Sequence, residues 1–289
     1  MKILLSGAQG QIGSELKEQG GDLIHACSRA ELDICDLRQV EQVVAAVQPS
    51  LIINTAAYTA VDQAESEPDK VFATNRDGVR NLAIVAKKYD LPLLHLSTDY
   101  VFDGSKPGAY LETDPITPLN IYGASKAAGE AVLQAEWEKH LIIRVSWVFG
   151  LQGKNFVKTI FNLAAQKPEL KIVADQKGCP TAAEDVARLL LHLAERVQQG
   201  QGPWGIFHYC GDKAVTWFEF AMLIVDLSKD YRQAQPLLKP VSTTEYPTPA
   251  QRPKNSVLNT QKIAQAYGIK APSWQKALPR VLKHLAGQS

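Results

Sequence analysis

An α/β fold built on a doubly wound parallel sheet is predicted by two features of the sequence. Short apolar runs bounded by turn residues alternate with longer segments of helical period, and the runs are apolar throughout. Strands of that kind are buried on both faces, as in a parallel sheet covered by helices on both sides. Such sheets bind ligands at the carboxyl ends of their strands, so the residues just after each run are the candidates for function.

The predicted elements follow one another as strand and helix. The five predicted strands are residues 3–6, 23–27, 51–54, 93–97 and 141–145. Helical patterns cover residues 12–19, 39–47, 71–88 and 122–139. Right-handed crossovers between such strands bring their carboxyl ends to one edge of the sheet.

Beyond residue 150 the sequence changes character. It contains more Pro, Gly and Trp, with turn-rich stretches at 200–205 and 246–253. Helical patterns recur at residues 184–198, 217–228, 261–267 and 273–285. We expect a smaller mixed lobe here, with segments such as 205–210 returning to the main sheet.

Composition excludes several classes of protein. The 31 basic and 30 acidic residues leave a net charge of +1, which provides no electrostatic attraction for nucleic acid or an anionic membrane surface. No apolar stretch approaches the roughly 20 residues of a membrane span. The four cysteines lack metal-ligand spacing, which suits a reducing compartment. We expect a soluble, cytoplasmic protein.

The first predicted strand runs into a loop with glycine at every third position, Gly7, Gly10 and Gly13, before a helix begins. Gly7 allows a tight turn, Gly10 lets backbone amides approach a pyrophosphate, and Gly13 lets the helix pack close to the strand. The loop predicts a Rossmann-type dinucleotide site. Residues 1–150 are then the dinucleotide-binding domain, and residues 151–289 are mainly a substrate-binding lobe.

The end of the second predicted strand bears on the choice of cofactor. Where a site for NAD usually carries an acidic residue, this sequence has Cys27-Ser28-Arg29. Arg29 fits the 2′-phosphate of NADPH, so we expect NADPH over NADH; a solvated loop arginine is the alternative. Asp36 either accepts a hydrogen bond from the adenine amino group or caps the helix that begins near Leu37.

Three side chains predict carbonyl–alcohol redox chemistry. Tyr122 and Lys126 stand four residues apart on a predicted helix and share a face. An adjacent ammonium is expected to lower the pKa of the phenol and make Tyr122 a usable acid and base. Thr98, at the end of the fourth predicted strand, is placed to polarise the reacting carbonyl. His95, inside that strand, is expected to be a satisfied core or surface group and not a metal ligand.

These motifs together resemble the extended short-chain dehydrogenases/reductases. The resemblance rests on the glycine loop, on residues 54–62 (NTAAYTAVD) and 97–102 (STDYVF), and on Tyr122 with Lys126. Residues 144–149 (RVSWVF), 175–181 (DQKGCPT) and 252–256 (RPKNS) narrow it to the sugar-nucleotide reductases that make dTDP-L-rhamnose. This narrower resemblance covers nearly the whole chain.

The resemblance implies reduction of the 4-keto group of dTDP-4-dehydro-6-deoxy-L-mannose. It implies cofactor contacts at Gly10, Gln11, Ile12, Asp36, Leu37, Ala56, Ala57, Tyr58, Tyr122 and Lys126, and substrate contacts at Thr98, Asp99 and Trp147. A core aromatic is the alternative for Trp147. Arg252 is a candidate clamp for the substrate diphosphate, with a solvated loop arginine as its alternative.

Some members of this family suggest a Mg²⁺ site at a dimer interface. Glu15 and Glu184 match two of its ligands, but His284 occupies the third position, and imidazole is a poor ligand for Mg²⁺. We expect no metal and leave open whether the chain is a monomer or a homodimer.

Other functions are compatible with the same family resemblance. A dehydratase needs a carboxylate after Asp99, where this sequence has Tyr100, and an epimerising reductase needs an extra base near the motifs. Another sugar-nucleotide reductase or epimerase, or a non-catalytic NADP-binding regulatory subunit, stays open. The complete Tyr122 and Lys126 pair favours an enzyme.

Overall fold

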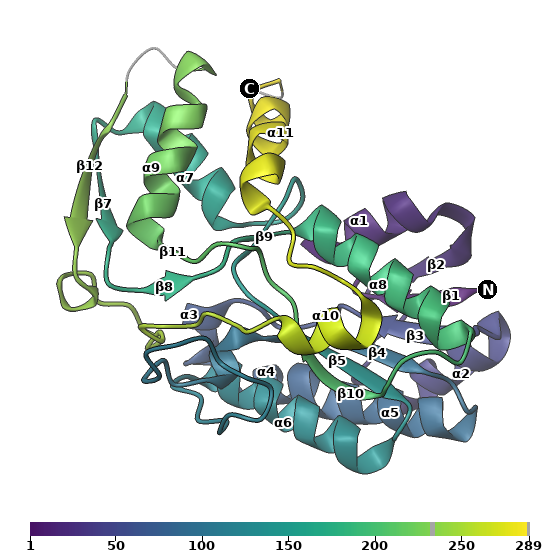
Figure 1. Ribbon diagram of the computed structural model, residues 1–289. Helices are drawn as coiled ribbons and strands as arrows, with labels where there is room; N and C mark the ends of the chain where they lie inside the picture. The colour runs from purple at the N-terminus through teal and green to yellow at the C-terminus, as the bar shows by residue number, and fades with distance from the viewer. Residues whose placement is uncertain (232–234, 288–289) are drawn as a thin grey trace.

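The computed structural model describes residues 1–231 and 235–287 as a layered α/β molecule with a smaller second lobe (Figure 1). Its main sheet has six strands in the order β10-β5-β4-β3-β1-β2, and every neighbouring pair is parallel. The strands are β1 (Ile3–Ser6), β2 (Ile24–Cys27), β3 (Leu51–Asn54), β4 (Leu93–Thr98), β5 (His140–Val145) and β10 (Gly205–His208). The predicted doubly wound sheet is confirmed.

Helices cover both faces of this sheet, as Figure 1 shows. One face packs against α2 (Leu37–Val47), α5 (Gly78–Lys88) and α6 (Ile121–Glu136), and the other against α1 (Gln11–Gly20), α8 (Ala183–Gln198) and α10 (Gln261–Tyr267). The strand residues are fully buried from Ile3 to Ser6 and from Leu51 to Asn54. Their uninterrupted apolar runs therefore have the two-sided burial that the sequence predicts.

The second lobe packs helices against short strand pairs. It contains α7 (Phe156–Gln166), α9 (Trp217–Leu227) and α11 (Trp274–Ala286), with β7 (Glu169–Val173) parallel to β12 (Leu237–Val241). Two-residue strands also pair: β6 (Val148–Phe149) with β9 (Thr181–Ala182), and β8 (Lys177–Gly178) with β11 (Val215–Thr216). Short 3-10 turns lie at Gly21–Leu23, Asp99–Val101, Lys229–Tyr231 and Thr243–Glu245.

The predicted helix over residues 71–88 is interrupted. It consists of α4 (Pro68–Phe72), a π-helical turn at Ala73–Asp77 and then α5, with the short α3 (Val61–Ala64) before it. The π turn buries Asn75, whose Oδ1 accepts a hydrogen bond from the backbone N–H of Tyr58 at 2.8 Å. The wider turn thus ties the loop after β3 to the helical layer.

The order in which strands are added to the sheet reverses at β1, because β2 lies on one side of β1 and β3 lies on the other. Crevices outside such switch points are the ligand sites of doubly wound sheets. The glycine loop after β1 and residues 55–62 after β3 both lie there. None of the helices in the described ranges is long and apolar enough to cross a membrane.

Candidate active site

The glycine loop packs as its spacing predicts. Gly7 has φ +76°, and a Cβ on it would lie 2.4 Å from the backbone nitrogen of Ala56. A Cβ on Gly13 would lie 2.2 Å from the carbonyl oxygen of Gly7. The nearest atom to a Cβ on Gly10 is 3.4 Å away, so the space in front of this residue is open where α1 begins. A pyrophosphate fits such a helix N-terminus.

A cleft of about 570 Å³ extends from this loop across the strand ends to the second lobe. Ten predicted site residues line it: Gly10, Gln11, Ile12, Gly13, Ala57, Thr98, Asp99, Tyr122, Lys126 and Trp147. The structure therefore brings residues from the first, third, fourth and fifth strand ends and from α6 to one place. Gly7 and Ala56 form the backbone packing beneath the loop instead.

Tyr122 and Thr98 meet inside the cleft. The Thr98 hydroxyl lies near the Tyr122 phenol, and it donates to Asp99 Oδ1 at 3.0 Å. Burial raises the pKa of Tyr122 to about 12; the nearby Thr98 hydroxyl lowers it and the Asp99 charge raises it. The expectation that an ammonium lowers this pKa is wrong for this structure, because Lys126 points elsewhere.

Lys126 is buried and faces the strands. Its Nζ donates to the carbonyl oxygen of Leu96 at 2.7 Å and lies 3.2 Å from His95 Nε2. Burial lowers the pKa of Lys126 to about 8, and the Glu130 charge opposes this shift. The lysine can therefore change its protonation state near neutral pH.

Two buried oxygen atoms on the cleft wall point to a polar ligand. Ser97 Oγ and Asp99 Oδ2 have no hydrogen-bond partner among the described residues. Burial raises the pKa of Asp99 to about 6, although nearby hydroxyls, including those of Ser256 and Thr98, lower it. Unsatisfied buried oxygens are rare in proteins, and sugar hydroxyls are suitable partners for them.

The wall contributed by the second lobe is aromatic. Trp147 stacks on Trp217 with ring centroids 3.3 Å apart, and its backbone has φ +46°, a strained value for a bulky residue. A Cβ on Gly178 would lie 2.3 Å from the Trp147 indole, so glycine is required beneath the ring. Trp147 is thus held in an unfavourable conformation at the cleft, which favours the substrate contact over a core role.

Other predicted residues lie outside the lining of this cleft. Arg29 is 72% exposed and lies 3.6 Å from Asp33. Asp36 caps α2 by accepting from the backbone N–H of Arg38 and of Gln39, so its capping alternative is confirmed. Leu37 is exposed on the first turn of that helix.

Tyr58 and Arg252 are engaged by protein groups. The Tyr58 phenol donates to Glu67 at 2.8 Å. Arg252 holds Asp62 through two contacts of 3.0 and 2.8 Å, and it also donates to Thr248 and Ala250. Arg252 is thus paired within the protein, and its role as a clamp for the substrate diphosphate stays a prediction.

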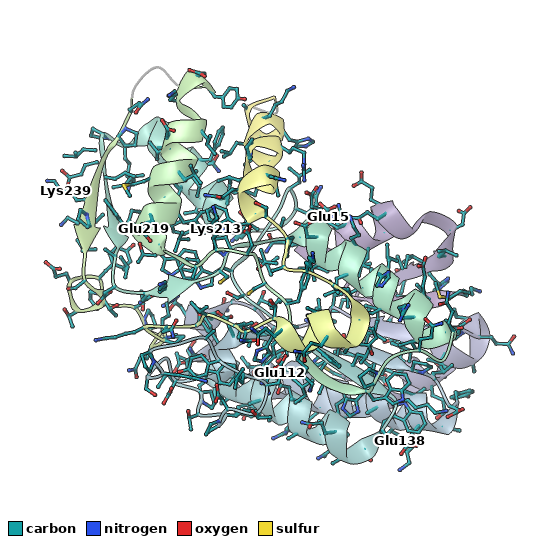
Figure 2. All side chains as sticks on the ribbon, in the orientation of Figure 1. Glu15, Glu112, Glu138, Lys213, Glu219 and Lys239 are labelled. Carbon is teal, nitrogen blue, oxygen red and sulfur yellow. The ribbon has the colours of Figure 1, made fainter. Side chains whose placement is uncertain are left out.

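The family's Mg²⁺ site does not fit this chain. Glu15, Glu184, Arg280 and His284 line one pocket between α1, α8 and α11, and Figure 2 shows Glu15 where these helices approach one another. The Arg280 guanidinium forms an ion pair with Glu184, so a positive group already occupies this place. Within residues 1–231 and 235–287, no three His, Cys, Asp or Glu side chains are grouped to hold a metal.

Several lining residues of the cleft, among them two from the second lobe, and one contact are absent from the predictions. Trp217 and Lys154 line the cleft from the second lobe. Asn155 caps α7 and donates from Nδ2 to Gln11 Oε1 at 2.9 Å, which joins the second lobe to the glycine loop. The run of apolar residues after Asn155 is a signal for α7 that was available in the sequence.

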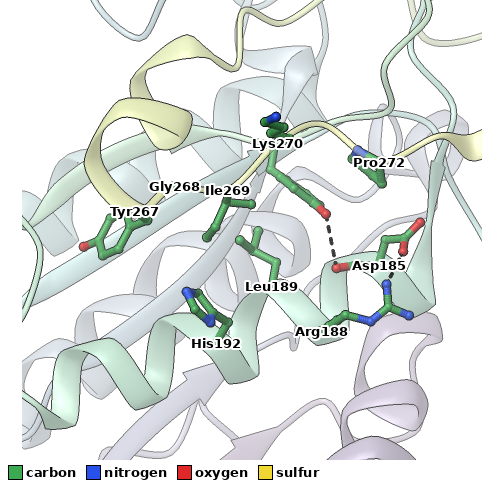
Figure 3. A pocket seen from close by; sticks show the side chains of 10 residues that line it. Asp185, Arg188, Leu189, His192, Tyr267, Gly268, Ile269, Lys270 and Pro272 are labelled. Carbon is green, nitrogen blue, oxygen red and sulfur yellow. Dashed lines mark hydrogen bonds and ion pairs between the residues drawn. The ribbon is translucent and has the colours of Figure 1, made fainter.

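A second pocket, of about 390 Å³, lies between α8 and the segment after α10 (Figure 3). Arg188 pairs there with the mostly buried Asp185, and Lys270 and His192 lie around the opening. The pocket contains none of the predicted site residues. The cleft at the switch point is therefore the candidate active site.

Because the helix with Tyr122 and Lys126 faces the glycine loop across the ends of a parallel sheet, the fold and the cleft define an enzyme of the short-chain dehydrogenase/reductase class. The family model for the RmlD substrate binding domain matches residues 1–286. The chain belongs to the dTDP-4-dehydrorhamnose reductase family.

Relatives along the whole chain carry this family assignment. A dTDP-4-dehydrorhamnose reductase of Aggregatibacter actinomycetemcomitans is 42% identical over 97% of this chain and 98% of its own. One of Sinorhizobium fredii is 39% identical over 98% and 97%. The crystal structure of the Bacillus anthracis reductase in complex with NADP superposes with a TM-score of 0.90, at 36% identity over 98% of this chain and 100% of that one.

Proposed function

We propose that the chain reduces the 4-keto group of dTDP-4-dehydro-6-deoxy-L-mannose with NADPH and yields dTDP-L-rhamnose. The family membership supports the substrate, and the NADP complex of the Bacillus anthracis relative supports the cofactor. One observation carries the chemistry: Thr98 and Tyr122 line the same cleft, which begins at the glycine loop, with their hydroxyls near each other.

The residues present fit a dinucleotide. The open space before Gly10 and the start of α1 suit the pyrophosphate, with Gln11, Ile12 and Gly13 beside it. We assign Ala57 and Lys126 to the nicotinamide half, since both line the same cleft. Arg29, Asp36, Leu37 and Tyr58 would meet the adenosine half, for which Arg29 favours the 2′-phosphate.

When bound, NADPH supplies the hydride that the carbonyl carbon receives. Tyr122 donates its phenolic proton to the carbonyl oxygen, which becomes the new hydroxyl. A pKa of about 12 keeps the phenol protonated at neutral pH, as a proton donor must be. Thr98 hydrogen bonds the same oxygen and stabilises the negative charge that develops on it.

The sugar nucleotide would lie between the two lobes. Asp99 and Ser97 offer unpaired buried oxygens to sugar hydroxyls, and Trp147 offers its ring face. Because Arg252 is held by Asp62, we assign the exposed Lys154 at the cleft to the diphosphate.

The proposal is tested by incubating the protein with NADPH and the 4-keto sugar nucleotide while absorbance at the nicotinamide band is followed. We expect NADPH oxidation that depends on the ketosugar, with dTDP-L-rhamnose identified by mass spectrometry and chromatography against a standard. Absence of oxidation, beside a known reductase that oxidises NADPH in the same mixture, would overturn the proposed substrate.

A further inference from the structure

A buried chain of polar side chains connects three strands to the lysine of the active site. Ser6 Oγ on β1 donates to Asn54 Oδ1 on β3 at 2.7 Å, and Asn54 Nδ2 lies 3.0 Å from His95 Nδ1 on β4. His95 Nε2 lies 3.2 Å from Lys126 Nζ on α6. All four side chains are at most 2% exposed, so water does not compete for these contacts.

The protein backbone fixes the orientation of the Asn54 amide. The N–H of Ala56 donates to Asn54 Oδ1 at 3.0 Å, and a backbone N–H can only donate. The amide nitrogen therefore faces His95 and donates to Nδ1. Since Nδ1 accepts, the proton of a neutral imidazole must be on Nε2.

His95 is held neutral. Its pKa is well below the ordinary value because it is buried, and the charges of Lys126 on α6 and His140 on β5 add to this effect. A neutral ring has one donor and one acceptor nitrogen, so it cannot accept from both neighbours.

This proton position has a consequence for Lys126. An N–H at His95 Nε2 points toward Nζ, and an ammonium has no lone pair to accept it, whereas a neutral amine has one. If the imidazole proton moved to Nδ1, it would face the donating Asn54 amide instead. With an ammonium at Lys126, two hydrogen-bond donors therefore oppose each other at one of the two His95 nitrogens. With a neutral amine, no donors oppose each other.

The other charged groups near Lys126 do not reverse this preference. Glu130, one turn further along α6, favours the ammonium, but both of its oxygens are bonded to Arg144 at 2.9 and 2.6 Å. The remaining contact of Nζ, with the Leu96 carbonyl oxygen, is available to either form because both carry N–H groups.

We propose that His95, oriented by Asn54, is a positioning residue that favours the neutral amine of Lys126 over its ammonium and so sets the pH range in which Lys126 is positively charged. This inference rests on the proposed function for the role of Lys126. The location of the imidazole proton, in contrast, depends on the fold alone.

The proton location is measured directly by long-range ¹H–¹⁵N NMR of the ¹⁵N-histidine-labelled protein without substrate. The His95 signals are those that disappear in His95→Phe. We expect a neutral ring with its proton on Nε2 and an unprotonated Nδ1. A ring protonated on Nδ1, or on both nitrogens, at neutral pH would overturn the inference, and this result is independent of any enzymatic activity.

The effect on Lys126 is measured as the pH dependence of kcat/KM for ketosugar reduction. On the proposed function Lys126 binds the nicotinamide half of NADPH as its ammonium, so activity should fall as pH rises through the pKa of Lys126. Removing the opposing N–H in His95→Phe raises that pKa and moves the alkaline limb up by roughly one pH unit. Asn54→Ala frees the imidazole proton to move to Nδ1 and shifts the limb in the same direction.

Ser6→Ala is the matched control, because Ala56 still fixes the Asn54 amide, and its alkaline limb should coincide with that of the wild type. A limb that stays in place in folded His95→Phe and Asn54→Ala would overturn the inference. If the wild type reduced no ketosugar, the proposed function would fail while the NMR result still decided where the proton lies.

Discussion

At the level of single residues, the active site depends on which polar group each side chain faces. Tyr122 faces Thr98, and Lys126 faces His95 and Leu96, although the tyrosine and lysine share one face of α6. Their four-residue spacing alone does not reveal this division, because the partners come from β4. Asp99, which accepts from Thr98, has a raised pKa and therefore a consequence for stability.

The buried Asp99 carboxyl should make stability depend on pH. Its pKa is raised from 3.8 to about 6, so the folded state binds the proton more tightly and stability falls as pH rises from about 4 to about 6. Asp99→Asn removes this component. Urea unfolding should show that, from pH 4 to pH 7, the free energy of unfolding of the wild type falls by about 2 kcal/mol relative to that of the variant.

If the difference in free energy of unfolding between Asp99→Asn and the wild type stayed constant across this pH range, the pKa of Asp99 would not be raised by folding. The same variant should weaken ketosugar binding, since Asp99 lines the cleft. Higher stability of Asp99→Asn at pH 7 together with weaker ketosugar binding would identify Asp99 as a residue that lowers stability but is needed for function.

The glycines of the loop separate packing from cofactor binding. Gly13→Ala places a Cβ against the Gly7 carbonyl and should destabilise the fold by about 1–3 kcal/mol. Gly10→Ala makes only an ordinary van der Waals contact, 3.4 Å from the Gly7 carbonyl oxygen. Its melting temperature should therefore stay near that of the wild type while NADPH affinity, measured by fluorescence titration, falls about tenfold or more.

Gly108→Ala serves as the control, because a Cβ there meets no atom within 4 Å. If Gly10→Ala bound NADPH as the wild type does, the pyrophosphate would not lie at the start of α1.

At the level of elements, the sequence predicts the sheet well because two-sided burial makes its strands uniformly apolar. The predicted strands 3–6 and 51–54 coincide with β1 and β3, and the helix 261–267 coincides with α10. The π turn at Ala73–Asp77 was missed, since a single added residue in a helical turn does not alter the apolar period enough to be recognised. The predicted helix over 122–139 ends early, at Glu136, where Trp137 Nε1 donates to Leu91.

The helices α1, α8 and α11 provide a prediction about metal dependence. Because Arg280 already pairs with Glu184, dialysis against EDTA should leave the rate of NADPH oxidation and the melting temperature unchanged. A loss of either that Mg²⁺ restores would show that a metal displaces the arginine.

At the level of the whole molecule, the cleft exists because the second lobe closes one side of the sheet edge. Contacts that are distant in sequence, such as Trp147 with Trp217 and Gln11 with Asn155, form this wall. No local pattern encodes such pairs, so the sequence located the catalytic side of the cleft and missed Trp217 and Lys154. The predicted boundary near residue 150 stays a prediction, although β10 lies in the main sheet.

Trp217 should act on substrate affinity through Trp147. Replacing it with leucine removes the stacking partner that holds the Trp147 ring in place. KM for the ketosugar should therefore rise about two- to tenfold, with a smaller change in kcat. Trp204→Leu, at a residue 38% exposed in the loop before β10, should keep the wild-type KM. Equal KM values for the two variants would remove Trp217 from the substrate wall.

The most direct test of the central claim compares Tyr122→Phe with Tyr209→Phe, a change in the second pocket away from the cleft. NADPH-dependent ketosugar reduction should fall by about 10²- to 10⁴-fold in Tyr122→Phe, with NADPH binding retained, because only the proton donor is lost. Tyr209→Phe should reduce the ketosugar at close to the wild-type rate. Near-normal reduction by folded, NADPH-binding Tyr122→Phe would contradict the account.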